Sequence, residues 1–137
     1  MVFTSPTNFV ATRMYYYVIQ AGSGSGKLQM GIYVPTATTT ASLVAATPII
    51  TVPAGGGLNG MTLTTTPTIN ANSTYYLVIY TTFNAQSIAG FGSVGLGSIF
   101  SAPPTNFRVQ NIPPTGLPAS ISTSDSSTKM APWLAVG

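Results

Sequence analysis

Two stretches of the chain are apolar at consecutive positions, and they carry the strongest information about its fold. Residues 14–20 read Met-Tyr-Tyr-Tyr-Val-Ile-Gln, and residues 75–80 read Tyr-Tyr-Leu-Val-Ile-Tyr. β-Branched and aromatic residues of this kind fit the pleated surface of a strand better than a helix. Successive side chains of a strand point to opposite faces, so each of these strands has two apolar faces. We therefore expect central strands of a β-sandwich, or strands whose outer face another subunit covers.

A third stretch, residues 27–34, alternates between apolar and more polar positions. Every second residue from Leu28 to Val34 is apolar, which predicts a strand that packs on the core through one face. Since a Gly/Ser-rich connection precedes it, we expect an antiparallel hairpin with residues 14–20. Shorter strands are expected at residues 42–46, 49–52, 61–65, 98–100, 107–110 and 133–136, with Pro35 ending the third strand and loops at 36–40, 53–60 and 115–128.

No window has the periodicity of an amphipathic helix of ordinary length. Many short strands separated by Gly and Pro indicate an all-β fold, an antiparallel β-sandwich of jelly-roll type. The length of 137 residues suits one domain. We expect residues 1–13 to form an N-terminal arm or edge strand and residues 14–137 to form a single β-sandwich domain.

The charge content narrows the possible partners. Only 4% of the residues are charged, against about 25% in ordinary soluble domains. The charged residues are Arg13, Lys27, Arg108, Asp125 and Lys129. The basic residues are scattered, whereas phosphate binding needs a clustered patch, so we expect no nucleic-acid partner. A surface with so little charge repulsion suits a protein that neighbours cover in an assembly.

Catalysis is the function class that the composition most nearly excludes. The chain has no His, Cys or Glu, so a Ser-His-Asp triad or a Cys-His pair cannot be built. A glycosidase needs two carboxylates, and Asp125 is the only one. The usual zinc ligands are missing, and one carboxylate with carbonyl groups would hold Ca²⁺ only weakly. We expect a protein that is not an enzyme, with no cofactor and no metal.

Three short motifs resemble functional signatures and are better explained as turns or loops. Residues 22–27 (Gly-Ser-Gly-Ser-Gly-Lys) lack the first Gly and the final Ser or Thr of a phosphate-binding loop. Residues 126–129 match Ser-x-x-Lys without the partner motif Lys-Thr-Gly. Residues 72–74 form a glycosylation sequon, but Asn and Ser here also favour a turn before the strand at 75–80.

The aromatic side chains are the candidate contact residues. Aromatic rings in strands are more often core or subunit-contact residues than platforms for sugar rings, and both readings stay open. Tyr33, on the more polar face of its strand, is the one expected to be most exposed. The candidate interface or ligand contacts are Tyr15, Tyr17, Tyr33, Tyr76, Tyr80 and Trp133, with Tyr16 and Tyr75 as further aromatics of the same strands.

The order of these motifs resembles a known family. A Tyr-rich strand, a Gly/Ser loop, Gly-Ile-Tyr at 31–33, the run at 70–78 and Pro-Trp-Leu at 132–134 follow one another. This order is similar to the β-sandwich domains, often jelly rolls, of virion proteins of tailed bacteriophages. The resemblance covers most of the chain from Met14 and implies assembly or attachment outside the cell. It brings no catalytic residues.

The resemblance and the composition together predict a non-enzymatic virion structural protein. We expect a capsid decoration or cement protein, or a collar or tail accessory protein, bound to other virion proteins and to copies of itself, with a trimer favoured. A chain that begins with Met and ends after one domain favours these roles over a fibre tip. The alternative is a module of a fibre or tail that binds a host receptor or surface glycan.

The first residues lack the basic and apolar regions of a secretory signal, and no apolar stretch is long enough to span a membrane. We therefore expect synthesis in the host cytoplasm, no membrane insertion, and a final location on the particle surface.

Overall fold

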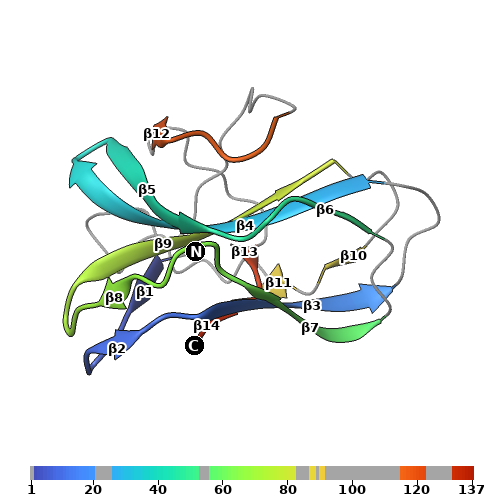
Figure 1. The fold of residues 1–137 in the computed structure, drawn as a ribbon, viewed down its shortest axis with the longest axis horizontal. Coiled ribbons are helices and arrows are strands. Elements are labelled where there is room, and N and C mark those ends of the chain that lie inside the picture. Colours follow the sequence, from blue (N-terminus) through green and yellow to red (C-terminus); the bar gives the residue numbers. More distant parts are fainter. Residues whose placement is uncertain are drawn as a thin grey trace.

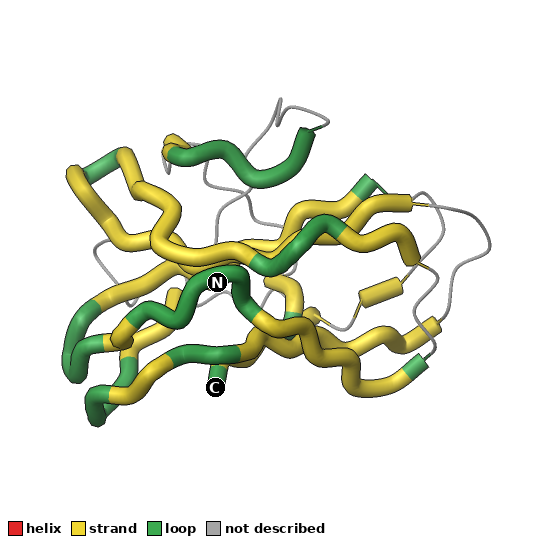
Figure 2. Tube along the Cα trace, viewed as in Figure 1, coloured by secondary structure: helices red, strands yellow, loops and turns green. Residues whose placement is uncertain are grey.

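The computed structural model describes residues 2–20, 26–52, 56–82, 87–88, 90–91, 115–122 and 131–137. Every regular element in these ranges is a strand, and Figure 2 shows strands joined by loops without a helix. All the strand pairs are antiparallel. The expected all-β sandwich is confirmed, and its jelly-roll connectivity stays a prediction.

One sheet is built around the long strand β4 and is called the β4 sheet below. It has six strands, and β6 pairs with the first part of β4 while β5 pairs with the rest. Its strands, in spatial order, are β1 (Val2–Thr4), β9 (Thr74–Thr81), β4 (Gly26–Ala37), β5 (Thr40–Ala46) and β12 (Ser120–Ser122), with β6 (Ile50–Val52) beside β4.

The other main sheet is built around β3 (Arg13–Gln20) and is called the β3 sheet below. Strand β7 (Gly57–Thr62) pairs with one side of β3, and β14 (Leu134–Val136) and β10 (Ser87–Ile88) pair with successive parts of the other side. Two short pairs complete the fold: β2 (Phe9–Val10) with β8 (Thr68–Ile69), and β11 (Gly90–Phe91) with β13 (Ala131–Pro132).

Figure 1 shows the β4 sheet above the β3 sheet, with the core between the two layers. Alternate residues of each central strand point into this core, as the two-residue period of a strand requires. Those from β3, β4 and β9 are almost completely buried: Met14, Tyr16, Val18, Leu28, Met30, Ile32, Tyr75 and Leu77. Phe3 and Phe9 add an edge-to-face ring contact with centroids 6.3 Å apart, and both pack against this core.

The outer face of the β4 sheet is also covered. Residues 115–122, which end in β12, run above this face in Figure 1 and are called the covering segment below. Ile121 of this segment packs with Tyr33 and Tyr76 of the sheet in a second apolar cluster. Strand β9 therefore has core on both faces, through Tyr75 and Leu77 on one side and Tyr76 on the other. The expectation of a central strand covered on both sides is confirmed for β9.

Thr47 bridges the interruption between β5 and β6. Its N–H donates to the Met30 carbonyl at 2.9 Å, and its hydroxyl oxygen accepts from the Met30 N–H at 3.0 Å. The same hydroxyl donates to the Pro48 carbonyl at 3.1 Å. The side chain is fully buried, so it supplies a ladder acceptor at a point where water cannot replace it.

The expected hairpin between residues 14–20 and 27–34 is wrong, because β3 and β4 belong to different sheets. A connection of several residues can turn a strand back beside its neighbour or carry it to the opposite layer. Pro35 does not end β4, which continues to Ala37 with a register shift after Pro35. A proline is tolerated in a strand where the ladder is irregular.

All three expected loops contain strand residues, and the loop expected at 36–40 holds the end of β4 and the first residue of β5, Thr40. Strand β7 begins at Gly57, inside the loop expected at 53–60, and β12 lies inside the loop expected at 115–128. The turn expected before the strand at 75–80 is confirmed, with Asn72 in the left-handed region at φ 58°. The strands expected at 98–100 and 107–110 lie outside the described residues.

We expect Thr47→Val to lower the free energy of unfolding by about 1–3 kcal/mol. The valine keeps the shape of the side chain but leaves the buried Met30 N–H without its acceptor. Urea unfolding followed by tryptophan fluorescence measures the change.

The matched control is Thr51→Val, the same chemical change at an exposed position of β6. It should stay within about 0.5 kcal/mol of the wild type. Equal effects of the two substitutions would show that the Thr47 hydroxyl has no special role.

Candidate interaction surface

The two faces of β3 have different surroundings. Met14, Tyr16 and Val18 point into the core and are buried. The alternate residues point outward, and Tyr17 is 44% exposed and Ile19 65% exposed. A strand with an apolar inner face and exposed apolar residues on its outer face is unusual, because ordinary solvated sheet faces are polar.

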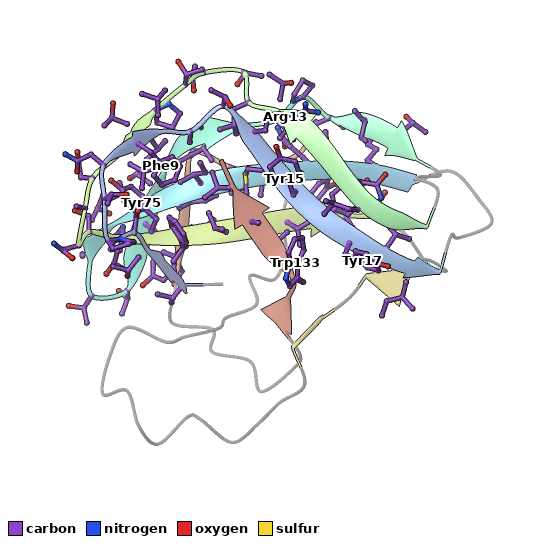
Figure 3. All side chains as sticks on the ribbon, turned by 90° about the horizontal axis from the view of Figure 1, so that it is seen from below. Phe9, Arg13, Tyr15, Tyr17, Tyr75 and Trp133 are labelled. Atoms are coloured by element: carbon purple, nitrogen blue, oxygen red, sulfur yellow. The ribbon has the colours of Figure 1, made fainter. Side chains whose placement is uncertain are left out.

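The neighbouring strands extend this apolar surface. Leu58 of β7 is 61% exposed and lies directly opposite Tyr17 in the strand register. Directly opposite residues share one face of a sheet, so these side chains are neighbours. On the other side Leu134 pairs with Tyr16, which brings the partly buried Trp133 level with Tyr17. Figure 3 shows the two beside each other.

Tyr15 lies over two positions that have no side chain. A Cβ atom on Gly60 would come within 2.8 Å of the Tyr15 ring, and one on Gly137 would come within 3.9 Å of it. The ring therefore occupies the space that a side chain at position 60 of β7 would fill, whereas at position 137 it leaves room for ordinary contact. The Arg13 guanidinium stands 5.9 Å from the centre of the Tyr15 ring, in the range of a cation–π contact.

We call the outward side of the β3 sheet the outer face. Its side chains come from three strands and include three of the six sequence candidates. It consists of Arg13, Tyr15, Tyr17, Ile19, Leu58, Thr62, Trp133 and Ala135.

Arg13 is the one charged residue among the described members of the outer face. Lys27 lies on β4 in the other sheet, and Arg108, Asp125 and Lys129 are outside the described residues. No group of three potential metal ligands of the His, Cys, Asp or Glu type occurs in the part of the chain that the structure describes. The described chain also contains no helix long and apolar enough to cross a membrane. The outer face therefore offers apolar contact and little else.

The other three candidates lie inside the protein. The expectation that Tyr33 is the most exposed aromatic is wrong, because its exposed fraction is 0%. Its hydroxyl donates to the Pro118 carbonyl of the covering segment at 2.7 Å. Tyr76 is buried in the same cluster, and Tyr80 is buried at the end of β9. None of these three is an accessible contact residue in this structure.

Burial changes the acidity of the enclosed tyrosines. Desolvation raises the pKa of Tyr33 far above its usual value of 10.0 because the phenolate would be buried beneath the covering segment. Desolvation also raises the pKa of Tyr16 and of Tyr76. These phenols stay neutral under any physiological condition, and all three side chains are core residues.

Sequence reasoning missed Ile19 and Leu58 as surface residues. The sequence does indicate Ile19, because it lies at an alternate position of its strand and therefore shares a face with Tyr15 and Tyr17. Nothing in the sequence indicates Leu58, because it lies among glycines in a stretch expected to be a loop. Its position opposite Tyr17 follows from the pairing of β7 with β3.

No family model matches the chain, and no curated protein and no solved structure matches it. The chemistry of the outer face is therefore the basis on which we infer a function.

We expect Tyr33→Phe to lower the free energy of unfolding by about 1 kcal/mol at pH 8, since the Pro118 carbonyl loses its donor. The difference from the wild type should shrink above about pH 10, the pKa of an unfolded-chain tyrosine. The raised pKa of folded Tyr33 gives stability that is complete below that pH and is lost as the pH rises further.

Urea unfolding at pH 8 and pH 11 measures both effects, and Tyr17→Phe is the exposed control. A difference that stays constant with pH would contradict the burial of an ionisable Tyr33.

Proposed function

We propose that this chain is a non-enzymatic structural protein of a virion that assembles through the outer face of the β3 sheet. The observation that carries the proposal is the neighbouring exposure of Tyr17, Ile19 and Leu58 on that face. Contiguous exposed apolar surface marks interaction sites, because leaving it in water costs free energy that a partner recovers.

The composition of the outer face suits a protein partner. Interface cores are depleted in charge and enriched in Tyr and Trp, and this face combines Tyr15, Tyr17 and Trp133 with a single charge. Aliphatic Ile19 and Leu58 add area that a protein surface would bury and that a sugar would leave wet. The low charge of the whole chain supports close packing among neighbours.

The virion setting comes from the sequence resemblance to bacteriophage β-sandwich domains. Within it, we propose a capsid decoration or cement protein, or a collar or tail accessory protein, on the particle surface. Its partners are other virion proteins and copies of itself, and a trimer stays the favoured oligomer.

The aromatic side chains favour one second candidate, a glycan-binding module. Tyr15, Tyr17 and Trp133 come together on one face of the sheet (Figure 3). Aromatic rings can stack on the apolar faces of sugar rings without needing charge.

We expect Ile19→Lys to weaken binding to particles that lack this protein by at least tenfold, because the lysine would have to be desolvated in an apolar contact. Light scattering of the mixture, with the bound protein counted per particle, measures the affinity and the number of sites. The wild type should saturate a fixed number of sites.

Val44→Lys is the matched control, since it places the same charge at a 38% exposed valine of β5 in the other sheet. Equal binding of the two variants would remove the outer face from the assembly contact.

For the glycan candidate, Tyr17→Ala and Trp133→Ala should abolish binding to bacterial surfaces. The exposed Tyr17→Ala variant should keep the urea midpoint of the wild type, and circular dichroism checks that Trp133→Ala is folded. Tyr33→Ala is unsuitable for this test because Tyr33 is buried. Unchanged cell binding by both folded variants would dismiss this function.

A further inference from the structure

Strand β7 forms one edge of the β3 sheet. It pairs with β3 through six consecutive residue pairs, from Arg13 opposite Thr62 to Val18 opposite Gly57, without a register shift. Within the described residues β3 is its only strand partner. At its end the chain leaves the edge, because the Thr64 N–H donates to the Ala46 carbonyl of the other sheet at 2.8 Å.

The hydrogen bonds of Arg13 show which backbone groups of β7 face outward. The Arg13 N–H donates to the Gly137 carbonyl at 2.8 Å, and the Arg13 carbonyl accepts from the Gly137 N–H at 3.0 Å. These groups therefore point away from β7. Along an antiparallel ladder the backbone N–H and C=O groups of successive residues point alternately to one neighbouring strand and to the other. The backbone groups of the β7 residues opposite Arg13, Tyr15 and Tyr17 therefore point away from β3.

The outward-facing backbone groups of β7 thus belong to Leu58, Gly60 and Thr62. Among the described residues, one hydrogen bond reaches them, from the Arg13 side chain to the Gly60 carbonyl at 3.5 Å. That carbonyl keeps a second lone pair for another donor.

Strand β7 also lacks the features that protect sheet edges. Natural edges carry charged side chains, prolines or bulges that prevent further pairing. The sequence of β7, Gly-Leu-Asn-Gly-Met-Thr, has no charge and no proline, and its register is regular.

We infer that two copies of this chain pair antiparallel through β7, about a two-fold axis at Gly60, so that their β3 sheets form one continuous sheet. In this register Leu58 lies opposite the partner's Thr62 and Gly60 lies opposite Gly60. All three outward-facing residues then form hydrogen-bonded pairs, which gives about six backbone bonds. With the axis at Asn59 or Met61, only two of these residues would form hydrogen-bonded pairs, which gives about four backbone hydrogen bonds.

The side chains suit this register. Gly60 brings no side chain of its own to the point where the strands cross, and the groups beside it are the Tyr15 ring and the Arg13 guanidinium. Each Leu58 on the outer face gains a threonine neighbour. Each Arg13 guanidinium reaches the Gly60 carbonyl of its own copy, so the two positive charges lie near the axis, and salt should strengthen the pairing by screening their repulsion.

This inference goes beyond the proposed function, because the contact uses the edge of the sheet and is independent of what the outer face binds. It replaces the trimer favoured there with a two-fold dimer. Its consequence for assembly is geometric. Pairing through β7 places the two outer faces side by side, so one dimer presents twice the apolar surface to a partner.

Cysteine cross-linking tests the register directly, because the chain contains no cysteine. Single variants Leu58→Cys and Thr62→Cys are purified, mixed in equal amounts and oxidised. Hydrogen-bonded antiparallel pairs have Cα atoms about 5.5 Å apart, within the range of a disulfide. The mixture should cross-link at least tenfold more than either variant alone. Cross-linking of Leu58→Cys with itself at the same level, or no cross-linking in the mixture, would overturn the inference.

A charge pair gives a second measurement that needs no oxidation. The double variant Leu58→Lys with Thr62→Lys sets like charges opposite each other at both crossings, whereas Leu58→Lys with Thr62→Glu sets opposite charges there. Light scattering should find the first monomeric and the second dimeric at the same concentration. Equal masses for the two, or a trimer in both, would refute pairing through β7. Neither measurement involves particles, so a failure here is distinct from a failure of the outer face to bind them.

Discussion

Burial of apolar side chains on both faces of β4 and β9 is the constraint on which the rest of the structure depends. The inner residues of these strands form the main core with β3. The outer residues include Tyr33 and Tyr76, and they would face water if the covering segment did not lie over them. Apolar burial contributes roughly 25 cal/mol per Å² of surface removed from water. The covering segment therefore contributes to the stability of the folded domain, although β12 is its only strand.

A few polar groups fix where the covering segment lies. Gln29 donates to the Thr47 carbonyl at 3.0 Å and accepts from the Leu117 N–H at 2.8 Å. One side chain thus joins the interruption between β5 and β6 to the covering segment. The Tyr33 hydroxyl adds a bond to Pro118. Apolar contact alone is not directional, so these bonds determine the position of the segment on an otherwise featureless apolar face.

The two sheets differ in a way that bears on function. The covering segment lies over the outer face of the β4 sheet, whereas Tyr17, Ile19 and Leu58 on the outer face of the β3 sheet remain exposed in the single chain. On both faces, apolar side chains that stay in contact with water cost free energy. An assembling protein resolves it by burying the second face against a neighbour, which is the basis of the proposed function. A chain with so few charges has little to oppose such contacts.

The sequence by itself determined the three central strands and which of their residues share a face. The runs at 14–20 and 75–80 gave two apolar faces to β3 and β9, and the alternation from Leu28 to Val34 gave the buried face of β4. These properties are local, because the two-residue period of a strand follows from backbone geometry. The absence of His, Cys and Glu is equally a property of the sequence.

Only the tertiary structure decided which apolar faces are covered. Tyr17 and Tyr33 both lie in apolar strands, yet one is exposed and the other is buried by a segment about 85 residues away, through the bond to Pro118. The assignment of β3 and β4 to different sheets, and the pairing that sets Leu58 opposite Tyr17, also depend on distant contacts. The local sequence pattern cannot predict this pairing and covering. It shows which faces of a strand are apolar and must be buried, but not which segment buries them.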